Sequence, residues 1–542
     1  MRKVTPSHRI RRLIRNRDSK WHPNHDFYKW FVLANVMIGT FMAVLDATIV
    51  NVALPKMMAS FGVGLDTIEW VLTAYMLAMA VMLPAAAWLA DHFGYKRMYF
   101  LGILVFTLGS FMCGMSTNEN VLIFSRVIQG LGAGIIQPLG MAIVVREFPP
   151  KQRGIAVGFW AVAAAASVSF GPLIGGYLVD HFNWQLIFDI NVPVGIFGMV
   201  ATIIIQREMI QKWGGKFDIV GFLSVSLFLP IILFALTEGN AATNSEGWHA
   251  PYILACFAIS FIAFAVFITA EFVVENPLID LRLLGNFNFG ISTLVMFLFG
   301  IGMFGSTFLL PLFLQNSLGY TALQSGSVFL PVGIIQGIVA PISGYVSGKI
   351  NAKIPIIIGI LLMSFSFYLN SHLSFLTEHS AIMLPLYLRG VGMGIIYSAL
   401  LAVSLVDIPR EKMAQASGIN NVIRQLGGSF GVAILATLLT ARVTFHSQMY
   451  GGALEANSPA YKSAVKSLSE SAVQTAGSSG AIASKQSQYI IVSNVTKQAY
   501  IEGINDDFLI AAVITMIGGI PVLFLRVRKK KKPLPADVVH LE

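Results

Sequence analysis

The heptapeptide GLGAGII, residues 130–136, decides the fold, because it returns as GVGMGII at residues 390–396. The two copies are 260 residues apart, and the same offset places the tripeptide SFG at 169–171 onto SFG at 429–431. Self-similarity at a fixed offset is the signature of a duplicated architecture. We therefore expect two copies of one structural unit in the same orientation.

The sequence around both motifs is strongly apolar. Hydrophobic residues make up 55% of the 542 residues, and charged residues only 12%. A helix that crosses a bilayer needs about 20 apolar residues. We predict fourteen such spans: 30–52, 68–90, 97–116, 120–143, 154–177, 184–205, 217–237, 250–272, 288–313, 322–347, 354–375, 380–405, 416–441 and 507–526.

Basic residues indicate how these spans are oriented, because Lys and Arg remain on the cytoplasmic side. The N-terminal tail holds nine basic residues, the C-terminal tail holds six, and the six short outer loops together hold one, Lys56. Both termini are therefore predicted to be cytoplasmic. Membrane topology explains the net charge of +10, so the basic character does not indicate nucleic-acid binding.

Enzyme chemistry and cofactors have no support in the sequence. The two cysteines, Cys113 and Cys256, both fall within predicted spans, so neither a disulfide framework nor a metal cluster is expected. The chain also lacks a glycine-rich phosphate loop and a nucleophile elbow. We predict a protein that is not an enzyme and that needs no cofactor.

Spans 1 to 6 and 9 to 14 are the two repeats, and spans 7 and 8 are an inserted pair. Parallel repeats with a site between them near the midplane are typical of one large class of transporters. The chain resembles the major facilitator superfamily, and within it the fourteen-helix drug:proton antiporter branch (EmrB/QacA-like). The resemblance implies an all-α membrane protein whose parts are a cytoplasmic tail 1–29, a six-helix bundle 30–205, inserted helices with linkers 206–287, a second bundle 288–526 and a tail 527–542.

Five segments carry this resemblance. LDATIVNVALP (45–55) is similar to the first-helix signature, RVIQGLGAG (126–134) to the fourth-helix signature, and WQLIFDINVPVG (184–195) also fits the branch. WLADHFGYKR (88–97) is similar to the gating loop, in which Asp91, Gly94 and Lys96 match while Ala87, His92 and Tyr95 depart from the usual residues. GFWAVAAAASVSFGPLIGG (158–176) is similar to the fifth-helix antiporter signature, whose matching residues are Gly158, Gly171, Pro172, Gly175 and Gly176.

Asp46 and Arg126 are isolated charges at the same depth of helices 1 and 4. A charge in the membrane interior costs about 2.5–3.5 kcal/mol even on lenient scales, so each is expected to have a partner or a hydrated cavity. An apolar environment favours a neutral carboxylic acid, whereas a nearby guanidinium favours the carboxylate. We hypothesise that the pair binds and releases the coupling proton; a permanent structural ion pair is the alternative.

Further charges bear on the substrate. Arg389 and Arg424 lie within helices 12 and 13 and have no acidic neighbour three or four residues away. The deep helix charges are thus three arginines against one aspartate, which favours anionic amphiphiles over lipophilic cations. Glu69 and Asp189 near the outer side are further candidates for the cavity wall. For these two acids, as for Glu238, interfacial hydration is the preferred interpretation.

The long outer segment 442–506 has helix-like spacing in YKSAVKSLSESAV and a possible strand in SQYIIVSNV. It is expected to contact a periplasmic adaptor protein that leads to an outer-membrane channel, to cap the outer gate, or to act as a spacer. The resemblance places the protein in a bacterial inner membrane.

The sequence thus predicts proton-driven export of amphiphilic toxic compounds by alternating access. An uptake symporter and a membrane sensor that uses a transporter fold without transport are the alternatives. A channel is disfavoured because no ring of repeated filter residues is present.

Overall fold

The computed structural model describes residues 27–210, 217–239, 244, 246–275, 277–347, 350–408, 412–452, 458–476 and 480–526. Every regular element within these ranges is helical, which confirms the predicted all-α class. Thirteen helices of the described part are long and apolar enough to cross a membrane. The remaining predicted span, 154–177, lies within the long helix α8 (Pro150–His181). The tail 527–542 and residues 1–26 lie outside the described residues.

The first bundle runs from α2 to α10. Its members are α2 (Tyr28–Ile49), continued by the 3-10 turn η1 (Val50–Val52), α3 (Leu54–Phe61), α4 (Leu65–Ile68), α5 (Trp70–Phe93), α6 (Tyr95–Gly114), α7 (Glu119–Glu147), α8, α9 (Leu186–Asp189) and α10 (Asn191–Ile205). The second bundle comprises α13 (Phe287–Asn316), α14 (Ala322–Ser327), α15 (Leu330–Ser347), α16 (Lys353–Asn370), α17 (His379–Ser404), α18 (Met413–Gly452) and α20 (Gly480–Ile517).

The repeated glycine motif fixes the same packing in both bundles. In the first, α7 lies between α5 and α6: a Cβ on Gly130 would lie 2.5 Å from the Tyr75 carbonyl oxygen, and one on Gly132 would overlap the Phe106 backbone. Glycine lets membrane helices approach this closely. The alternating glycines therefore place one helix against two neighbours at once.

The second copy of the motif makes the equivalent contacts. A Cβ on Gly390 would lie 2.7 Å from the Val332 carbonyl oxygen of α15, and one on Gly392 would lie 2.9 Å from the Gly359 carbonyl oxygen of α16. Helix α17 thus lies between α15 and α16 as α7 lies between α5 and α6. The sequence repeat corresponds to a repeat of packing.

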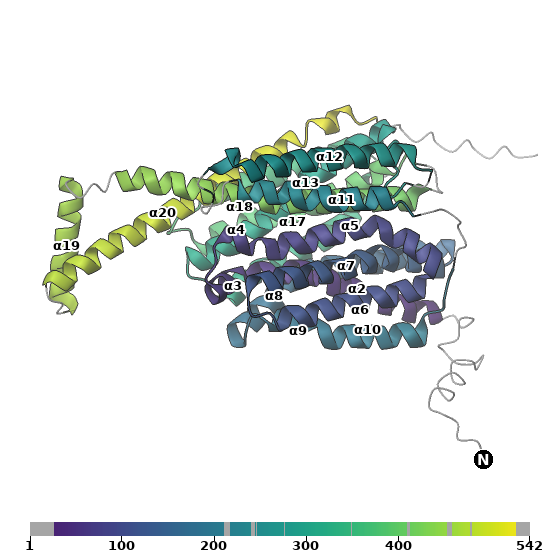
Figure 1. The fold of residues 1–542 in the computed structure, drawn as a ribbon, viewed down its shortest axis with the longest axis horizontal. Helices are drawn as coiled ribbons and strands as arrows, with labels where there is room; N and C mark the ends of the chain where they lie inside the picture. The colour runs from purple at the N-terminus through teal and green to yellow at the C-terminus, as the bar shows by residue number, and fades with distance from the viewer. Residues whose placement is uncertain are drawn as a thin grey trace, which may run out of the picture.

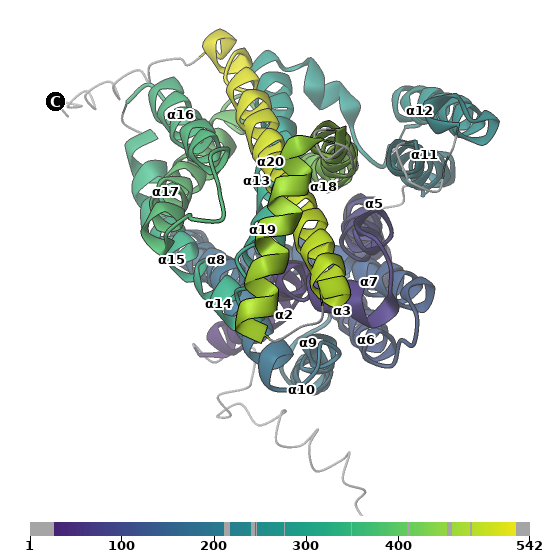
Figure 2. The same ribbon diagram turned by 90° about the vertical axis from the view of Figure 1, so that its left-hand side faces the viewer.

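The inserted helices α11 (Ile219–Glu238) and α12 (Pro251–Val273) pack on each other at the edge of the molecule. Figure 2, which looks along the helices, shows this pair beside α5 of the first bundle and α18 of the second. The two bundles meet directly where α5 packs against α18 and where α8 packs against α14 and α15.

A helical projection extends beyond the bundles at one end (Figure 1). It consists of the ends of α18 and α20 and of α19 (Pro459–Ala476) across their tips. The 40 residues of α18 span about 60 Å at 1.5 Å per residue, roughly twice a bilayer core. The predicted helix in YKSAVKSLSESAV is confirmed, but the strand at 487–495 is wrong, because this stretch belongs to α20 and α20 packs along α18 and α19.

Candidate functional site

A buried ion pair joins α2 to α7. Arg126 Nη1 donates to Asp46 Oδ2, and both side chains are fully excluded from solvent. Arg126 Nε also donates to the Val71 carbonyl oxygen at 2.8 Å, and its guanidinium carbon lies 4.0 Å from the centre of the Tyr75 ring. Both contacts come from α5, so three helices meet at one charge pair.

Neutral amides complete the shell of Asp46. Its Oδ1 accepts hydrogen bonds from Gln129 Nε2 at 2.8 Å and from Asn191 Nδ2 at 3.0 Å. Gln129 Oε1 accepts from Arg126 Nη1 at 2.6 Å, and Gln129 Nε2 also donates to Ser110 Oγ at 2.7 Å. The sequence analysis missed Gln129 and Asn191, because an uncharged amide in a membrane span gives a much weaker signal than a charge.

The pair is held by contacts beyond its two charges. The Asp46 carboxylate has a guanidinium and two amide donors, and the Arg126 guanidinium also donates to the Val71 carbonyl oxygen and to Gln129 Oε1. Removing one member of a buried pair leaves the other charge uncompensated, at a cost of about 3–5 kcal/mol. The charge of Asp46 and the position of Arg126 therefore depend on each other.

The gating-loop aspartate lies at the opposite end of the first bundle from the projection. Asp91 Oδ1 accepts a hydrogen bond from the Tyr95 hydroxyl at 2.7 Å and pairs with Arg146 Nη2 at 3.4 Å. The Arg146 guanidinium carbon lies 4.0 Å from the centre of the Tyr95 ring. Asp91 is thus bound to the end of α7, within its own bundle.

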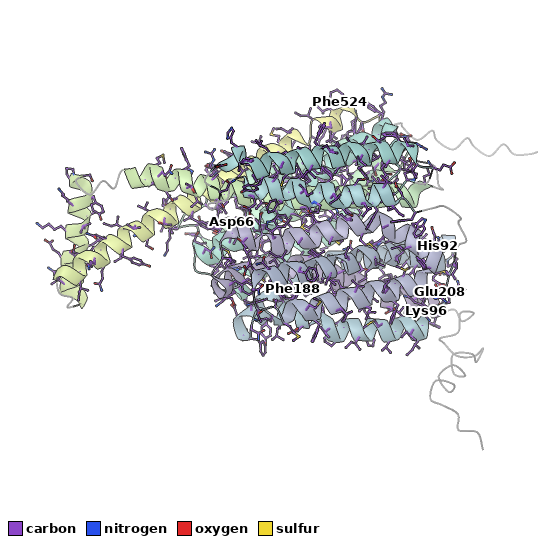
Figure 3. All side chains as sticks on the ribbon, in the orientation of Figure 1. Asp66, His92, Lys96, Phe188, Glu208 and Phe524 are labelled. Carbon is purple, nitrogen blue, oxygen red and sulfur yellow. The ribbon has the colours of Figure 1, made fainter. Side chains whose placement is uncertain are left out.

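Gly94 and Lys96 make the turn from α5 into α6. Gly94 has φ +101°, a conformation that favours glycine, and a Cβ there would overlap the Glu208 carboxylate. The Lys96 backbone amide donates to Glu208 Oε1 at 3.1 Å, and its Nζ donates to the Ile203 carbonyl oxygen at 2.7 Å. Figure 3 shows Lys96, Glu208 and His92 together at this end, with Asp66 at the other.

The fifth-helix motif packs α8 against α2. A Cβ on Gly171 would overlap Thr48 Oγ1, and one on Gly175 would lie 2.8 Å from the Ile49 carbonyl oxygen. Gly158 lies in the same helix, closer to its N-terminal end. The close contact is made just beyond Asp46 along α2, so the motif supports the helix that carries the buried carboxylate.

The other side of the same motif contacts the second bundle. A Cβ on Gly176 would overlap the Ala322 carbonyl oxygen of α14, and one on Gly326 would overlap the Pro172 carbonyl oxygen. The Asp180 carboxylate also accepts hydrogen bonds from the first two backbone amides of α14, at 3.1 and 2.7 Å. We call this α8–α14 contact the outer seal, because it lies at the projection end of the molecule.

Arg389 occupies, in the second bundle, the repeat position of Gln129 at the offset of 260. Its side chain is buried and its Nη2 donates to Thr307 Oγ1 and to the Met303 carbonyl oxygen. Its Nε and Nη1 have no hydrogen-bond partner in the described part of the chain. The second bundle therefore places a cation where the first places an amide.

Arg424 lies at the boundary between the bundles. Its Nη2 donates to Asn421 Oδ1 at 2.8 Å, and its guanidinium carbon lies 5.6 Å from the ring centre of Phe304 and 5.7 Å from that of Tyr397. Gly428, one helical turn further on, touches Phe304 and also Met76 of the first bundle. The guanidinium thus stands among aromatic rings on the wall that faces the first bundle.

The expectation that Glu69 lies at a hydrated interface is wrong. Glu69 is fully buried and accepts a hydrogen bond from Thr237 Oγ1 of α11 at 2.8 Å, because the inserted pair covers the start of α5. Asp189 and Glu238 are partly exposed, and Asp189 lies at the end of the short helix α9. The structure does not bring Glu69 and Asp189 into one cluster with Arg389 and Arg424 through any hydrogen bond or ion pair between described residues.

The sequence-based tally of deep charges also needs correction. It counted one aspartate against three arginines, but Glu69, Glu271 and Asp507 are fully buried as well. Asp507 was missed because the last predicted span begins at that residue, so it was taken as a boundary. The interior of the protein is therefore less cationic than the sequence suggested.

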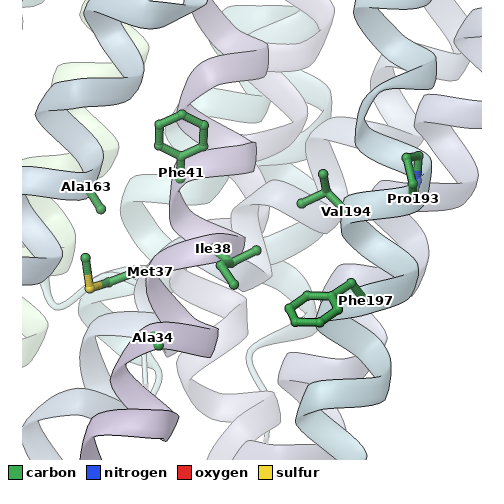
Figure 4. Close-up of a pocket in the computed structure, with 8 residues that line it drawn as sticks. All are labelled: Ala34, Met37, Ile38, Phe41, Ala163, Pro193, Val194 and Phe197. Carbon is green, nitrogen blue, oxygen red and sulfur yellow. The ribbon is translucent and has the colours of Figure 1, made fainter.

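An apolar groove lies between α2, α8 and α10 (Figure 4). Its volume is about 680 Å³. It is lined by Ala34, Met37, Ile38, Phe41, Ala163, Pro193, Val194 and Phe197. With this lining the groove can accept an apolar chain but cannot recognise a charge.

The sequence matches known membrane transporters over most of its length. Residues 36–432 match the family described as Major Facilitator Superfamily. The chain is 31% identical to "Uncharacterized MFS-type transporter YhcA" of Bacillus subtilis, over 92% of this chain and 94% of that protein. It is 29% identical to "Multidrug export protein EmrB" of Escherichia coli over 89% and 92%, and 32% identical to "Multidrug resistance protein Stp" of Mycobacterium tuberculosis over 74% of each chain.

Solved structures show the same fold. A bacterial homologue of the human lysosomal transporter Spinster, in an inward-facing and occupied conformation, has a TM-score of 0.59 at 15% identity and covers 92% of this chain and 97% of its own. A proton-dependent oligopeptide transporter has a TM-score of 0.57 at 13% identity, over 91% and 98%. The helix arrangement, the duplicated packing motif and the sequence matches agree, and the chain belongs to the major facilitator superfamily of membrane transporters.

Proposed function

We propose that the protein exports amphiphilic toxic compounds in exchange for protons across a bacterial inner membrane, with both termini in the cytoplasm. The observation that carries this proposal is the fully buried Asp46–Arg126 pair, whose carboxylate also accepts hydrogen bonds from two neutral amides. The names of relatives such as "Multidrug export protein EmrB" support the substrate class. Bundles 30–205 and 288–526 are the proposed moving units, with 206–287 as a peripheral insert.

The proposed cycle starts from a state that is closed on the outside. In this state the outer seal joins the bundles, while the gating-loop Asp91 is bound to Arg146 of its own bundle. Substrate enters from the inner side, and opening of the outer seal exposes Asp46 to external protons. Protonation frees Arg126, and return of the proton to the inner side restores the ion pair.

Export rather than uptake is supported by the fifth-helix motif. Gly171, Gly175 and Gly176 bring α2, α8 and α14 together within about one and a half helical turns, so the outer seal lies directly beside the helix of Asp46. Protonation at Asp46 is therefore placed to alter the seal that controls release to the outside. The test uses proteoliposomes with an imposed pH gradient. Substrate added on the side opposite to the protons should discharge the gradient, because antiport moves substrate and protons in opposite directions.

Arg424 is the proposed docking point for the acidic group of an anionic substrate. Arg424→Gln is expected to raise the KM for an anionic amphiphile by about tenfold or more, because a hydrogen bond to a charged group is worth about 1.5–3 kcal/mol. The KM of a neutral amphiphile of matched size should change little. Arg282→Gln, on a residue that is bonded only to the Phe272 carbonyl oxygen in the described structure, is the control. An equal change for both compounds would contradict an anion-binding role.

The projection is proposed to dock a periplasmic adaptor protein that leads to an outer-membrane channel. Part of α20 extends beyond the bundles (Figure 1), and exposed apolar side chains of this helix include Tyr489 and Val492. Deletion of residues 450–500 should lower efflux from intact cells while leaving substrate and proton exchange in proteoliposomes unchanged. If efflux from cells is also unchanged, the projection is a spacer.

A further inference from the structure

The carboxylate of Asp507 is unlike every other fully buried acid in the described structure. Asp46 has Arg126 and two amides, Glu69 has the Thr237 hydroxyl, and Glu271 accepts from the Ile279 backbone amide. Asp507 is also 0% exposed, yet neither of its oxygens has a hydrogen-bond partner among the described residues. This is a buried polar group that the transport cycle outlined above does not use.

The surroundings of Asp507 are apolar on its own helix. Ile504 and Ala511, which lie three and four residues away on the same face of α20, and the adjacent Phe508 are all fully buried. An unpaired carboxylate in such a place carries a desolvation cost of several kcal/mol, whereas the neutral acid costs far less. The apolar surroundings therefore favour a bound proton over a bare carboxylate.

A route to water begins at the preceding residue. Asp506 is 30% exposed and pairs with Arg442 Nε at 3.3 Å and with His446 Nε2 at 2.9 Å, both on α18. Arg442 and Asp506 are the charged groups that act on Asp507, and Tyr500, which accepts a hydrogen bond from Asn316 of α13, lies near it on α20. These groups lie on the packed helices α18 and α20, and the partly exposed Asp506 is adjacent in sequence to the buried acid.

Asp507 and Asp46 lie in different bundles. Asp46 is on α2 of the first bundle, and Asp507 is on α20 of the second. Each bundle therefore holds a fully buried aspartate within a candidate membrane-spanning helix.

We propose that Asp507 is a second proton-binding site, loaded from the outer side past Asp506 and His446, whose proton is transported together with that of Asp46. In the loaded state the carboxyl O–H bond of Asp507 is intact. On release this bond breaks and the proton passes to water. Arg442 then leaves Asp506 and pairs with the Asp507 carboxylate. The claim that the Asp507 proton is transported rests on the proton coupling proposed above. The claim that Asp507 binds a proton is independent of that coupling.

Infrared spectroscopy of the full-length protein in membranes tests the bound proton. A carbonyl band of protonated carboxylic acids is expected in the wild type. Asp507→Asn should remove one component of this band, whereas the control Glu246→Gln, on an exposed residue, should leave the band unchanged. Asp507→Asn should also melt at an unchanged temperature, since the native group is already neutral. A spectrum of Asp507→Asn that has lost no carbonyl component, or the same loss in Glu246→Gln, overturns the proposal.

The number of protons moved per substrate tests the transport part. In proteoliposomes with an internal pH dye, Asp507→Asn should lower this ratio by half while leaving substrate binding intact, and the control Glu246→Gln, on an exposed residue, should keep it. An unchanged ratio in Asp507→Asn overturns the inference while leaving the proposed function standing. Persistence of all proton movement in Asp46→Asn would instead refute the proposed function.

Discussion

Asp46→Asn is expected to abolish substrate transport driven by a pH gradient while leaving the protein folded. The asparagine side chain keeps the size of the carboxyl group and can still bond Gln129 and Asn191, but it binds no transported proton. Exchange of labelled for unlabelled substrate, which needs no net proton movement, should continue. Both activities are measured in the same proteoliposomes, with the gradient present or collapsed.

Two variants make this result specific. Asp189→Asn changes another aspartate of the first bundle that is partly exposed, and it should transport as the wild type does. Asp46→Leu leaves Arg126 without an acid and should destabilise the fold by about 3–5 kcal/mol, so its melting temperature should fall. Full gradient-driven transport by Asp46→Asn would show that the pair is a permanent structural contact.

Gly176→Ala is expected to open the outer seal and to stop export. The added Cβ would overlap the Ala322 carbonyl oxygen and would lie 2.5 Å from the Leu323 Cα, and neither backbone atom can turn aside. Overpacking of a close contact costs about 1–3 kcal/mol, which is enough to change the balance between two transport states. A cysteine placed at buried Ser325 of α14 should then react with an impermeant thiol reagent added outside.

The matched control is Gly337→Ala in α15, where no heavy atom lies within 4 Å of the added Cβ. That variant should transport normally and keep residue 325 protected. Equal protection in Gly176→Ala, together with lost transport, would show that the glycine is needed for the stability of the bundle rather than for closure of the outer side.

The membrane helices were predictable because their signal is large. Each span is a long apolar run, and the two glycine motifs at one offset gave the duplication that the packing of α7 and α17 bears out. The Asp46–Arg126 contact was also predictable from the sequence, since two isolated charges at equal depth of the membrane have few possible partners. A polar or charged group in the wrong place of a membrane helix is energetically costly, so these features leave a clear pattern in the sequence.

The remaining features escaped because their determinants are not local. SQYIIVSNV has the β-branched residues of a strand, but α18 and α19 stabilise it as part of a helix. Glu69 looked interfacial until α11, more than 150 residues later, was placed over it. Asp507 follows a polar stretch, and only the assembled second bundle shows that its oxygens are enclosed.

The unbroken length of α18 gives the transporter a mechanical reach that a short outer loop would not have. The same helix carries Arg424 on the wall between the bundles and ends at Gly452, about 42 Å further along at 1.5 Å per residue. Because the helix is continuous, a small tilt of the second bundle at the level of Arg424 produces a larger displacement at the tip of the projection. A spectroscopic label on α19 would therefore read the state of the interior from outside the membrane, and a protein that grips the tip would restrain the interior in return.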